Sequence, residues 1–405
     1  MLTAATQPGT GARTGVTSPQ GYRAAAVQAG IRKQRPDLAL LVSDVAASAA
    51  GCFTTNLCAA PCVDWTRGAV RGKVSAILVN SGNANACNGA QGAKDNAAMA
   101  AAAAAALGVE ASGVAVASTG VIGVPMPMAK VLPGISRLAA ALSPEGGAAA
   151  ATAIMTTDTR PKERSLAINL TQGTVTIGAM AKGSGMVHPN LATMLTFITT
   201  DAAVPGPLLQ AMLAQAMART FNMITVDGDT STNDMVVALA NGAAGVAVGP
   251  GTEDAAVFAA ALESVCLAMA QAIVADGEGA QRTIAVTVSG AADEGTAVIA
   301  AKAVARSALV KTAVAGGDAN WGRVMAALGA SGAGFDPTQV AIGLGPVVVA
   351  RNGQGVPFAE LEAARVLDLT VVPIVISLGD GPGQATAWGC DLTCEYVKIN
   401  ASYRS

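Results

Sequence analysis

The chain has 405 residues, enough for about two or three domains with sizeable cores. Its 25 lysines and arginines are nearly balanced by 27 aspartates and glutamates, so it lacks the basic surplus that a nucleic-acid-binding surface requires. The longest apolar run, residues 97–107, falls short of the roughly 20 residues that cross a bilayer, and no signal-peptide pattern opens the sequence. We therefore expect a soluble, cytoplasmic protein with neither a nucleic-acid nor a membrane partner.

Strand and helix patterns alternate along the chain. Short runs of apolar and β-branched residues between glycines and prolines predict strands at 75–80, 114–117, 166–170, 174–178, 194–198, 235–239, 284–289, 339–342, 347–350 and 369–376. Helical periodicity predicts helices at 94–107, 128–142, 206–221, 254–275 and 295–307. Residues 143–151 are predicted to be a surface connection. Long helices beside many short strands indicate a layered α+β or α/β body.

Cysteine and histidine content restricts the chemistry. Seven cysteines, an odd number in a chain without a secretion signal, do not predict a disulfide framework. With His188 as its single histidine, the chain cannot form a two-histidine metal site, and a Ser-His-Asp triad could be built only around that residue. The segment Gly68–Lys73 is one residue short of a phosphate-binding loop and is followed by Val74. We therefore expect no metal, no resident cofactor and, in an enzyme, a general base other than imidazole.

The segment from Gly178 to Phe197 carries the clearest chemical pattern. A glycine-rich turn bearing Lys182 leads through Pro189 to Ala192, Thr193 and an apolar strand. This order suits an enzyme with an N-terminal nucleophile, in which the Thr193 hydroxyl attacks the Ala192 carbonyl and the chain is cleaved between them. The freed α-amine, with an ordinary pKa of about 7.7–8.0, would then serve as the general base. From spacing alone, the usual interpretation of Thr193 is a β-branched core residue.

Ten blocks occur in the order found in one known family. They are Asn80–Ala86, Ser118–Gly123, Ile154–Asp158, Met180–Met186, Pro189–Leu195, Asp229–Asp234, Asp276–Gly279, Leu309–Ala313, Asn320–Arg323 and Tyr396–Asn400. Through them nearly the whole chain resembles the ornithine acetyltransferases, arginine-biosynthesis enzymes that also act as glutamate N-acetyltransferases. The resemblance implies an αββα-type, N-terminal-nucleophile-like core in which two packed sheets are covered by helices.

The resemblance also implies an activity. Thr193 would take the acetyl group from N2-acetyl-L-ornithine and pass it to L-glutamate through an acetyl-threonine ester, which predicts ping-pong kinetics. Thr119 and Gly120 match the family's oxyanion hole, the first through its hydroxyl and the second through its backbone N–H. Taken alone, Ser118–Gly120 would be interpreted as a tight turn after a strand.

The family's substrate contacts match Thr156, Lys182, Thr193, Glu278, Asn400 and Ser405. A lysine suits a substrate carboxylate and a glutamate suits an amino group. Thr157 remains an alternative to Thr156, and Arg404 is a departure that places a bulky charge beside Ser405. Asp227, Asp229, Asn233 and Asp234 either support the site or form a turn network.

The resemblance implies self-cleavage at Ala192–Thr193. The small chain would be 1–192, carrying the oxyanion hole, and the large chain 193–405, with two of each in a heterotetramer. It leaves open whether acetyl-CoA is a second acetyl donor, which would make the enzyme bifunctional. Two alternatives stay open: a self-processing amidohydrolase or aminopeptidase of the same fold, and an uncleaved metabolite-binding protein.

Overall fold

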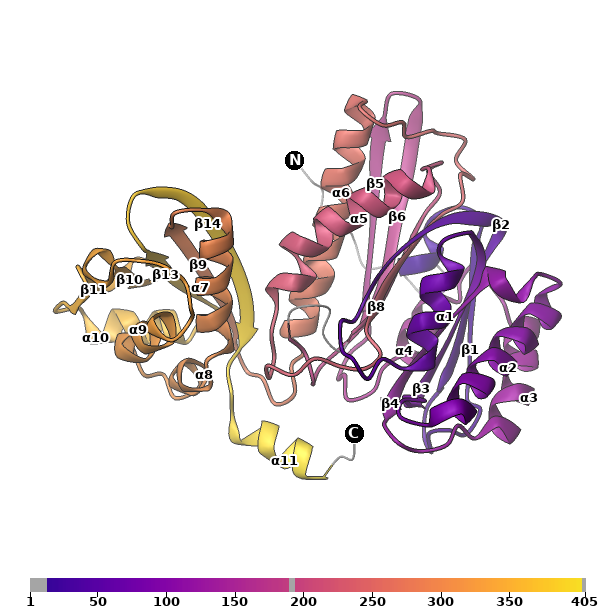
Figure 1. Cartoon of the computed structure of the whole chain (residues 1–405), viewed down its shortest axis with the longest axis horizontal. Helices are drawn as coiled ribbons and strands as arrows, with labels where there is room; N and C mark the ends of the chain where they lie inside the picture. Colours follow the sequence, from indigo (N-terminus) through magenta and orange to yellow (C-terminus); the bar gives the residue numbers. More distant parts are fainter. Residues whose placement is uncertain (1–12, 189–193, 403–405) are drawn as a thin grey trace.

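A computed structural model describes residues 13–188 and 194–402. The first part contains β1 (Tyr22–Val27), β2 (Leu38–Phe53), α1 (Pro61–Ala69), β3 (Lys73–Asn83), α2 (Gly89–Leu107), β4 (Val114–Val121), α3 (Met128–Ala140), α4 (Gly147–Ala153), β5 (Lys162–Leu170), β6 (Gly173–Lys182), β7 (Leu195–Thr200), α5 (Gly206–Arg219), β8 (Met235–Ala240) and α6 (Glu253–Val274). Its strands are hydrogen-bonded in the order β4-β3-β2-β8-β7-β6-β5, with β1 paired to β2. Figure 1 shows this part in indigo to pink.

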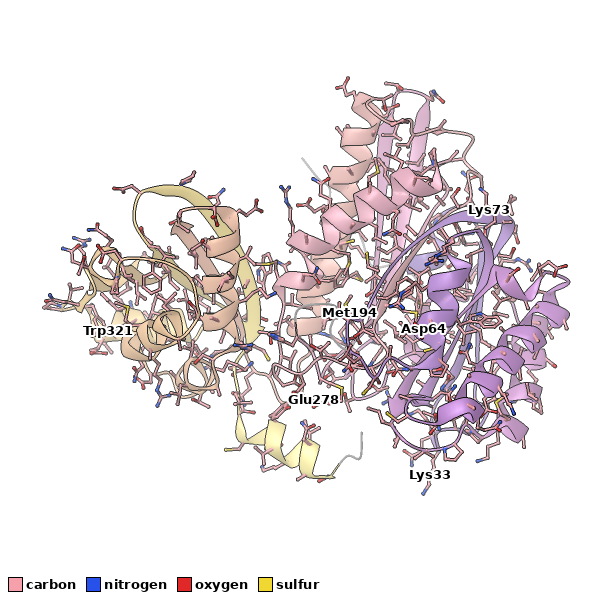
Figure 2. All side chains as sticks on the ribbon, in the orientation of Figure 1. Lys33, Asp64, Lys73, Met194, Glu278 and Trp321 are labelled. Atoms are coloured by element: carbon pink, nitrogen blue, oxygen red, sulfur yellow. The ribbon has the colours of Figure 1, made fainter. Side chains whose placement is uncertain are left out.

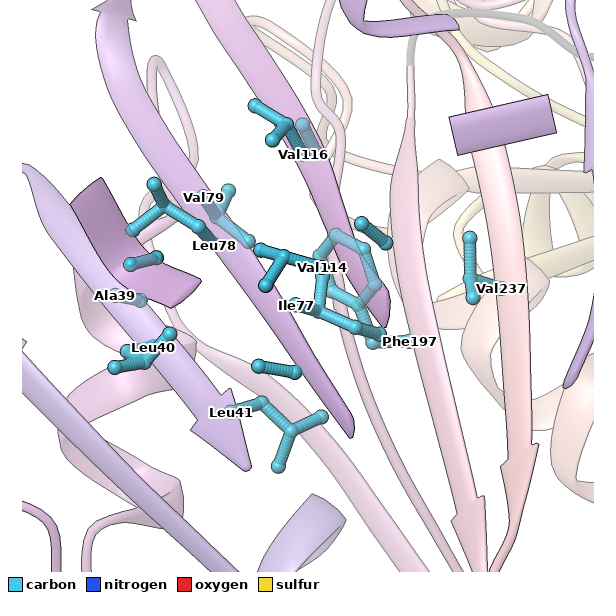
Figure 3. Packing of buried hydrophobic residues seen from close by; sticks show 14 of the residues in the cluster. Ala39, Leu40, Leu41, Ile77, Leu78, Val79, Val114, Val116, Phe197 and Val237 are labelled. Atoms are coloured by element: carbon cyan, nitrogen blue, oxygen red, sulfur yellow. The ribbon is translucent and has the colours of Figure 1, made fainter. Parts of the chain in front are cut away.

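Strand β2 divides this sheet into two layers. Residues 38–43 pair with β1, and residues 48–53 pair with β8, with a register shift against β3 between Val42 and Ala47. Phe197 and Val237 share a core cluster with Ile77 and Val114 of the β1–β4 layer, and Figure 3 shows Phe197 beside Ile77 and Val114. The two layers therefore pack face to face.

Side-chain alternation along β8 shows both faces of the second layer covered. Val237 and Leu239 enter the core shared with β1–β4, whereas Val236 and Ala238 enter a second core with α5 and α6. Helices α1, α2 and α3 contribute to the first core and pack with β2 and β4. The order helix, sheet, sheet, helix confirms the expected αββα-type core.

The last third of the chain forms a further sheet with its own core. It contains β9 (Thr283–Gly290), α7 (Glu294–Arg306), α8 (Ala308–Ala315), α9 (Trp321–Gly329), β10 (Ala341–Leu344), β11 (Val347–Arg351), β12 (Gln354–Gly355), α10 (Glu360–Leu367), β13 (Val371–Ser377), β14 (Gly381–Cys390) and α11 (Cys394–Ser402). The strand order is β12-β11-β10-β13-β9-β14. Trp388 of β14 packs against the cores of both parts. After β14 the chain leaves this sheet, and α11 lies below the junction of the two parts (Figure 1).

One expectation from the sequence is wrong. The predicted connection 143–151 contains most of α4, in which Ala150 and Ala151 are buried; its Ser-Pro-Glu-Gly-Gly start resembles a turn, but the alanines that follow favour a helix. Helix α6, predicted at 254–275, is the helix among the described residues that is long and apolar enough to cross a bilayer. Since Phe258, Val265 and Ile273 are buried in the core shared with α5, α6 is a core helix here.

Candidate functional site

A cavity of about 180 Å³ lies where the ends of β4 and β6 meet α11 and the segments after α4 and α6. Its lining residues come from both halves of the chain: Ala84, Thr119, Gly120, Ile122, Thr156, Thr157, Lys182, Gly185, Met186, Asp227, Asp229, Ser231, Thr232, Asn233, Glu278, Tyr396 and Asn400. Figure 2 shows Glu278 above α11, at the junction between the first part of the chain and the further sheet of its last third.

The structure brings together every predicted site residue that it describes. These residues are Thr119, Gly120, Thr156, Lys182, Glu278 and Asn400. Thr157 lines the same cavity, so the alternative to Thr156 stays open. Ala192, Thr193, Arg404 and Ser405 lie outside the described residues.

The predicted oxyanion residues stand at the end of β4. Thr119 pairs with Ser81 and Gly120 with Gly82 of the parallel strand β3. Gly120 has a φ of +130°, and a Cβ atom there would overlap the carbonyl carbon of Gly82. Only glycine fits this close approach of two backbones. The Thr119 hydroxyl accepts a hydrogen bond from Lys182 Nζ across 3.3 Å.

Lys182 brings a positive charge into the buried end of the cavity. It is the last residue of β6, and its side chain is 2% exposed. Burial lowers the pKa of Lys182, while the neighbouring carboxylates of Asp158 and Asp234 act in the opposite direction. A desolvated ammonium of this kind gains strongly from an anionic ligand.

A buried ion-pair network supports this region. Lys162 Nζ lies 2.7 Å from Asp158 Oδ1 and 2.5 Å from Asp276 Oδ2, with all three side chains almost fully buried. Asp158 also accepts hydrogen bonds from the Thr156 and Gly183 backbone N–H groups. Burial alone would raise the pKa of Asp158, but the ammonium groups of Lys182 and Lys162 hold it at about 2. The network thereby positions two segments of the cavity wall.

Glu278 adds a carboxylate to the cavity that Lys182 also lines. Its backbone N–H donates to the Ser184 carbonyl across 2.9 Å, and its side chain occupies the space where a Cβ on Gly185 would lie. Asn400 Nδ2 donates to Glu278 Oε2 across 2.8 Å. The segment containing Glu278 is therefore tied both to the glycine-rich turn and to α11.

Helix α11 closes one side of the cavity. Gly279, at φ +71°, lets the helix backbone approach closely, and Thr393 Oγ1 donates to the Gly279 carbonyl across 2.7 Å. The Tyr396 hydroxyl donates to Asp227 Oδ2, and the same carboxylate accepts the backbone N–H groups of Met186 and Val187. Through Tyr396 and Asn400, the C-terminal helix thus forms part of the cavity lining. Sequence reasoning missed Tyr396, which only appeared as the first residue of a matching block.

Asp234 lies next to the predicted cleavage segment. Its Oδ1 accepts the backbone N–H of Met194 across 2.8 Å, whereas its buried Oδ2 has no hydrogen-bond partner among the described residues. Burial raises the pKa of Asp234 well above its ordinary value. Its neighbour Asn233 donates to the carbonyls of Ala84 and Ser118. The block 229–234 therefore joins loops that line the cavity and also supports the start of β7.

His188 does not line the cavity. Its Nδ1 lies 3.2 Å from Thr225 Oγ1, and burial together with Arg306 and Lys302 lowers its pKa to about 4. The imidazole is consequently neutral near pH 7. Within residues 13–188 and 194–402, no group of three histidine, cysteine, aspartate or glutamate side chains is placed to hold a metal ion.

Comparison with known proteins identifies the family. The ArgJ family matches residues 23–405. The chain belongs to the ArgJ family. An ArgJ relative from Symbiobacterium thermophilum, an arginine biosynthesis bifunctional protein, is 56% identical over 96% of this chain and 98% of its own length. The ArgJ protein of the same description from Parasynechococcus marenigrum is 48% identical over 96% and 95%.

Solved ArgJ structures are also similar. The arginine biosynthesis bifunctional protein ArgJ from Bacillus halodurans matches with 45% identity and a TM-score of 0.50, covering 51% of this chain and 98% of that chain. Ornithine acetyltransferase from Mycobacterium tuberculosis, solved as a complex with ornithine, is 42% identical, with a TM-score of 0.41 and coverage of 44% and 95%. Membership of the ArgJ family confirms the resemblance inferred from the ten sequence blocks.

Proposed function

We propose that this chain is an ornithine acetyltransferase of arginine biosynthesis, which transfers the acetyl group of N2-acetyl-L-ornithine to L-glutamate. The products are L-ornithine and N-acetylglutamate. The observation that carries this proposal is one small cavity in which a buried ammonium, Lys182, and a buried carboxylate, Glu278, accompany the candidate oxyanion residues Thr119 and Gly120. A cavity of about 180 Å³ suits a small amino-acid derivative.

The charges in the cavity match both substrates. Acetylornithine has one carboxylate and a distal ammonium, and glutamate has two carboxylates. Lys182 is suited to bind a substrate carboxylate. Its buried ammonium has lost stabilisation by water, and a bound carboxylate offsets that loss. Glu278 is suited to bind an amino group, with Asn400 holding its carboxylate in place. Thr156 is held at the cavity wall by Asp158 and is proposed as a further substrate contact.

Thr193 is the proposed nucleophile. Its hydroxyl attacks the acetyl carbonyl, the C–N bond breaks, and ornithine leaves with the proton that the Thr193 α-amine has relayed. Glutamate then attacks the ester through its amino group and regenerates the hydroxyl. Thr119 and the Gly120 N–H stabilise the oxyanion of each tetrahedral intermediate. Since Lys182 already donates to the Thr119 oxygen, the Thr119 proton can point toward that oxyanion.

Activation by cleavage at Ala192–Thr193 is part of the proposal. The small chain 1–192 would supply Thr119, Gly120, Thr156 and Lys182, and the large chain 193–405 would supply Thr193, Glu278, Asn400 and Ser405. The solved Bacillus halodurans chain, 98% of which aligns with half of this chain, is of the length that such a division produces. A cytoplasmic heterotetramer of two small and two large chains completes the proposal.

Intact-mass measurement and a product assay test these statements. We expect two fragments in the wild type, the larger beginning at Thr193, and one uncut chain in Thr193→Ala. With acetylornithine and glutamate we expect N-acetylglutamate and ping-pong kinetics. Free acetate in place of N-acetylglutamate would identify an amidohydrolase. An uncut, inactive wild-type chain of 39.7 kDa would instead identify a metabolite-binding protein.

A further inference from the structure

A buried lysine outside the cavity has no role in the proposed mechanism. Lys311 belongs to the sequence block Leu309–Ala313 and lies on the buried face of α8 with Val310 and Val314, where it is 2% exposed. No carboxylate in the described part of the chain lies within ion-pair distance of its ammonium. Burying a charge without a counter-ion is costly, and a methionine would fill similar space without that cost. Packing alone therefore does not explain a lysine here.

The Lys311 ammonium holds the chain that leaves the last sheet toward α11. Its Nζ donates to the Cys390 carbonyl and lies 3.5 Å from the Cys390 Sγ atom. The Lys311 carbonyl in turn accepts the backbone N–H of Leu392 across 3.3 Å. Figure 1 shows α8 beside the chain that runs from β14 to α11. Lys311 thus contacts both ends of the segment 390–392, through its side chain and its backbone.

The same segment is bonded to the turn that carries Glu278, residues 276–282, which we call the Glu278 turn. Asp391 Oδ1 accepts the backbone N–H groups of Gln281 and Arg282 at 2.8 and 3.1 Å. The Asp391 N–H donates to the Arg282 carbonyl across 3.0 Å. Three hydrogen bonds therefore join the end of the Glu278 turn to one residue of the segment that Lys311 holds.

Close packing joins the two segments at further points. A Cβ atom on Gly277 would lie 2.9 Å from Cys390 Sγ, and one on Gly279 would lie 2.6 Å from the Tyr396 backbone nitrogen. Thr393 Oγ1 donates to the Gly279 carbonyl. Because both glycines are in such close contact with the chain after β14, a shift of that chain would move the turn with it.

The charges of Lys311 and Asp391 lie close to one residue. Asp391 is also 2% exposed, and its Oδ2 has no hydrogen-bond partner among the described residues. Burial raises the pKa of the Cys390 thiol, while Lys311 lowers it and Asp391 raises it. An ammonium and a carboxylate in one buried region attract each other, which reduces the cost of burying both.

We propose that Lys311 is a positioning residue for recognition of the substrate amino group, acting through Cys390 and Asp391 on the Glu278 turn. This proposal rests on the proposed function, in which Glu278 binds that amino group. Lys311 is not among the described residues that line the cavity, so it acts through its neighbours. A displacement of the carboxylate on the order of 1 Å weakens its contact with an ammonium. The last sheet thereby contributes to substrate binding, although its core lies outside the cavity.

Steady-state kinetics of Lys311→Met test the proposal. Methionine keeps most of the length and the apolar packing of the side chain but removes the ammonium. The matched control is Leu328→Ala, which removes a fully buried side chain from the core that Val310 of α8 also enters. This control destabilises the same core without removing a hydrogen bond to the segment 390–392.

We expect Lys311→Met to raise the KM for N-acetylornithine by about tenfold, with kcat within about threefold of the wild type. Lys311→Arg restores a cation that can bind the Cys390 carbonyl, and it should recover part of the loss. Leu328→Ala should lower the melting temperature but keep the KM within about twofold. Intact mass should show normal self-cleavage in all three variants.

A double-mutant cycle separates positioning of Glu278 from a general structural effect. In a Glu278→Gln background, Lys311→Met should raise the KM by no more than about twofold, because the carboxylate that it positions is already absent. Asp391→Ala removes the acceptor of two N–H groups of the Glu278 turn and should also raise the KM. Asp391→Asn keeps an oxygen there and should have a smaller effect. These two variants decide the question if Lys311→Met does not fold.

Three results would overturn the inference and leave the proposed function intact. The first is a normal KM in both Lys311→Met and Asp391→Ala. The second is a rise in KM that is as large in the Glu278→Gln background as in the wild type. The third is an equal rise in Leu328→Ala, which would indicate loosening of the whole core. A wild-type enzyme that does not transfer acetyl from acetylornithine, or a Glu278→Gln enzyme with a normal KM, would instead contradict the proposed function.

Discussion

Lys182 Nζ donates a hydrogen bond to Thr119 Oγ1 across 3.3 Å, and both side chains are buried. The bond joins the residue proposed to hold the substrate carboxylate to the residue proposed to stabilise the oxyanion. Because the Thr119 oxygen accepts from the ammonium, its own proton is directed to another acceptor. We therefore expect substrate binding at Lys182 and the orientation of the Thr119 hydroxyl to be coupled.

Replacing Thr119 with valine should remove this oxyanion donor while keeping the side-chain shape. We expect Thr119→Val to lower kcat for acetyl transfer by about 10²–10³-fold. Thr119→Ser retains the hydroxyl and should stay within about tenfold of the wild type. Steady-state rates with acetylornithine and glutamate measure both, and a Thr119→Val enzyme with unchanged kcat would rule out the assigned role.

Removing Lys162 should be strongly destabilising. In Lys162→Ala, the carboxylates of Asp158 and Asp276 lose their shared partner, at a cost of about 3–5 kcal/mol in the free energy of unfolding. The exposed pair Arg67–Asp64 provides a control, since Arg67→Ala should cost at most about 1 kcal/mol. Urea unfolding of both variants measures the difference. Equal losses of unfolding free energy in Lys162→Ala and Arg67→Ala would show that the buried ion pairs of Lys162 stabilise the fold no more than the exposed pair.

The same network predicts a pH dependence. The pKa of Asp158 is about 2 in the folded protein and about 3.8 ordinarily, so its ionisation favours the folded state. This contribution is complete above pH 3.8 and is lost as the pH falls toward 2, an effect on the order of 2 kcal/mol. In Lys162→Ala the pKa of Asp158 should rise, because burial is then opposed by Lys182 but not by Lys162. Urea unfolding between about pH 5 and pH 2 should show a smaller loss in the variant.

A methyl group at Gly185 should displace the Glu278 carboxylate. A Cβ there would overlap that carboxylate, so Gly185→Ala should raise the KM for acetylornithine by at least about tenfold. Gly68→Ala is the control: no atom lies within 4 Å of the added Cβ, and the position is helical. That variant should be stabilised by about 0.5–1 kcal/mol with normal kinetics. A normal KM in Gly185→Ala would show that Glu278 does not contact this substrate.

Asp234 should position the cleavage segment through Met194. Asp234→Ala removes the acceptor of the Met194 N–H and should slow self-cleavage by up to about 10²-fold, since small displacements are costly in such reactions. Asp234→Asn keeps an oxygen at that position and should cleave faster than Asp234→Ala. The rate at which the two fragments appear during expression or refolding measures this. Cleavage of Asp234→Ala at the wild-type rate would contradict a positioning role.

Most of the strands and the five longest helices were predictable because their signals are local. The apolar stripe of α6 and the β-branched runs of β9 and β13 depend on residues a few positions apart. Strand β2 was missed because it is rich in alanine, which has little preference for strands, and because its bend follows from pairing with distant strands. Helix α11 was missed because much of its contact is with the segment after α6.

The sequence by itself determined the family, the local elements and the candidate residues Thr119, Gly120, Thr156, Lys182, Glu278 and Asn400, because these depend on short motifs in a fixed order. Only the tertiary structure decided that these six residues line one cavity. It also decided that Lys162 bridges Asp158 and Asp276, and that Arg35 donates to the Thr156 carbonyl. The Lys162–Asp276 and Arg35–Thr156 contacts join residues more than a hundred positions apart, and they form only when strand order and helix packing bring distant segments together.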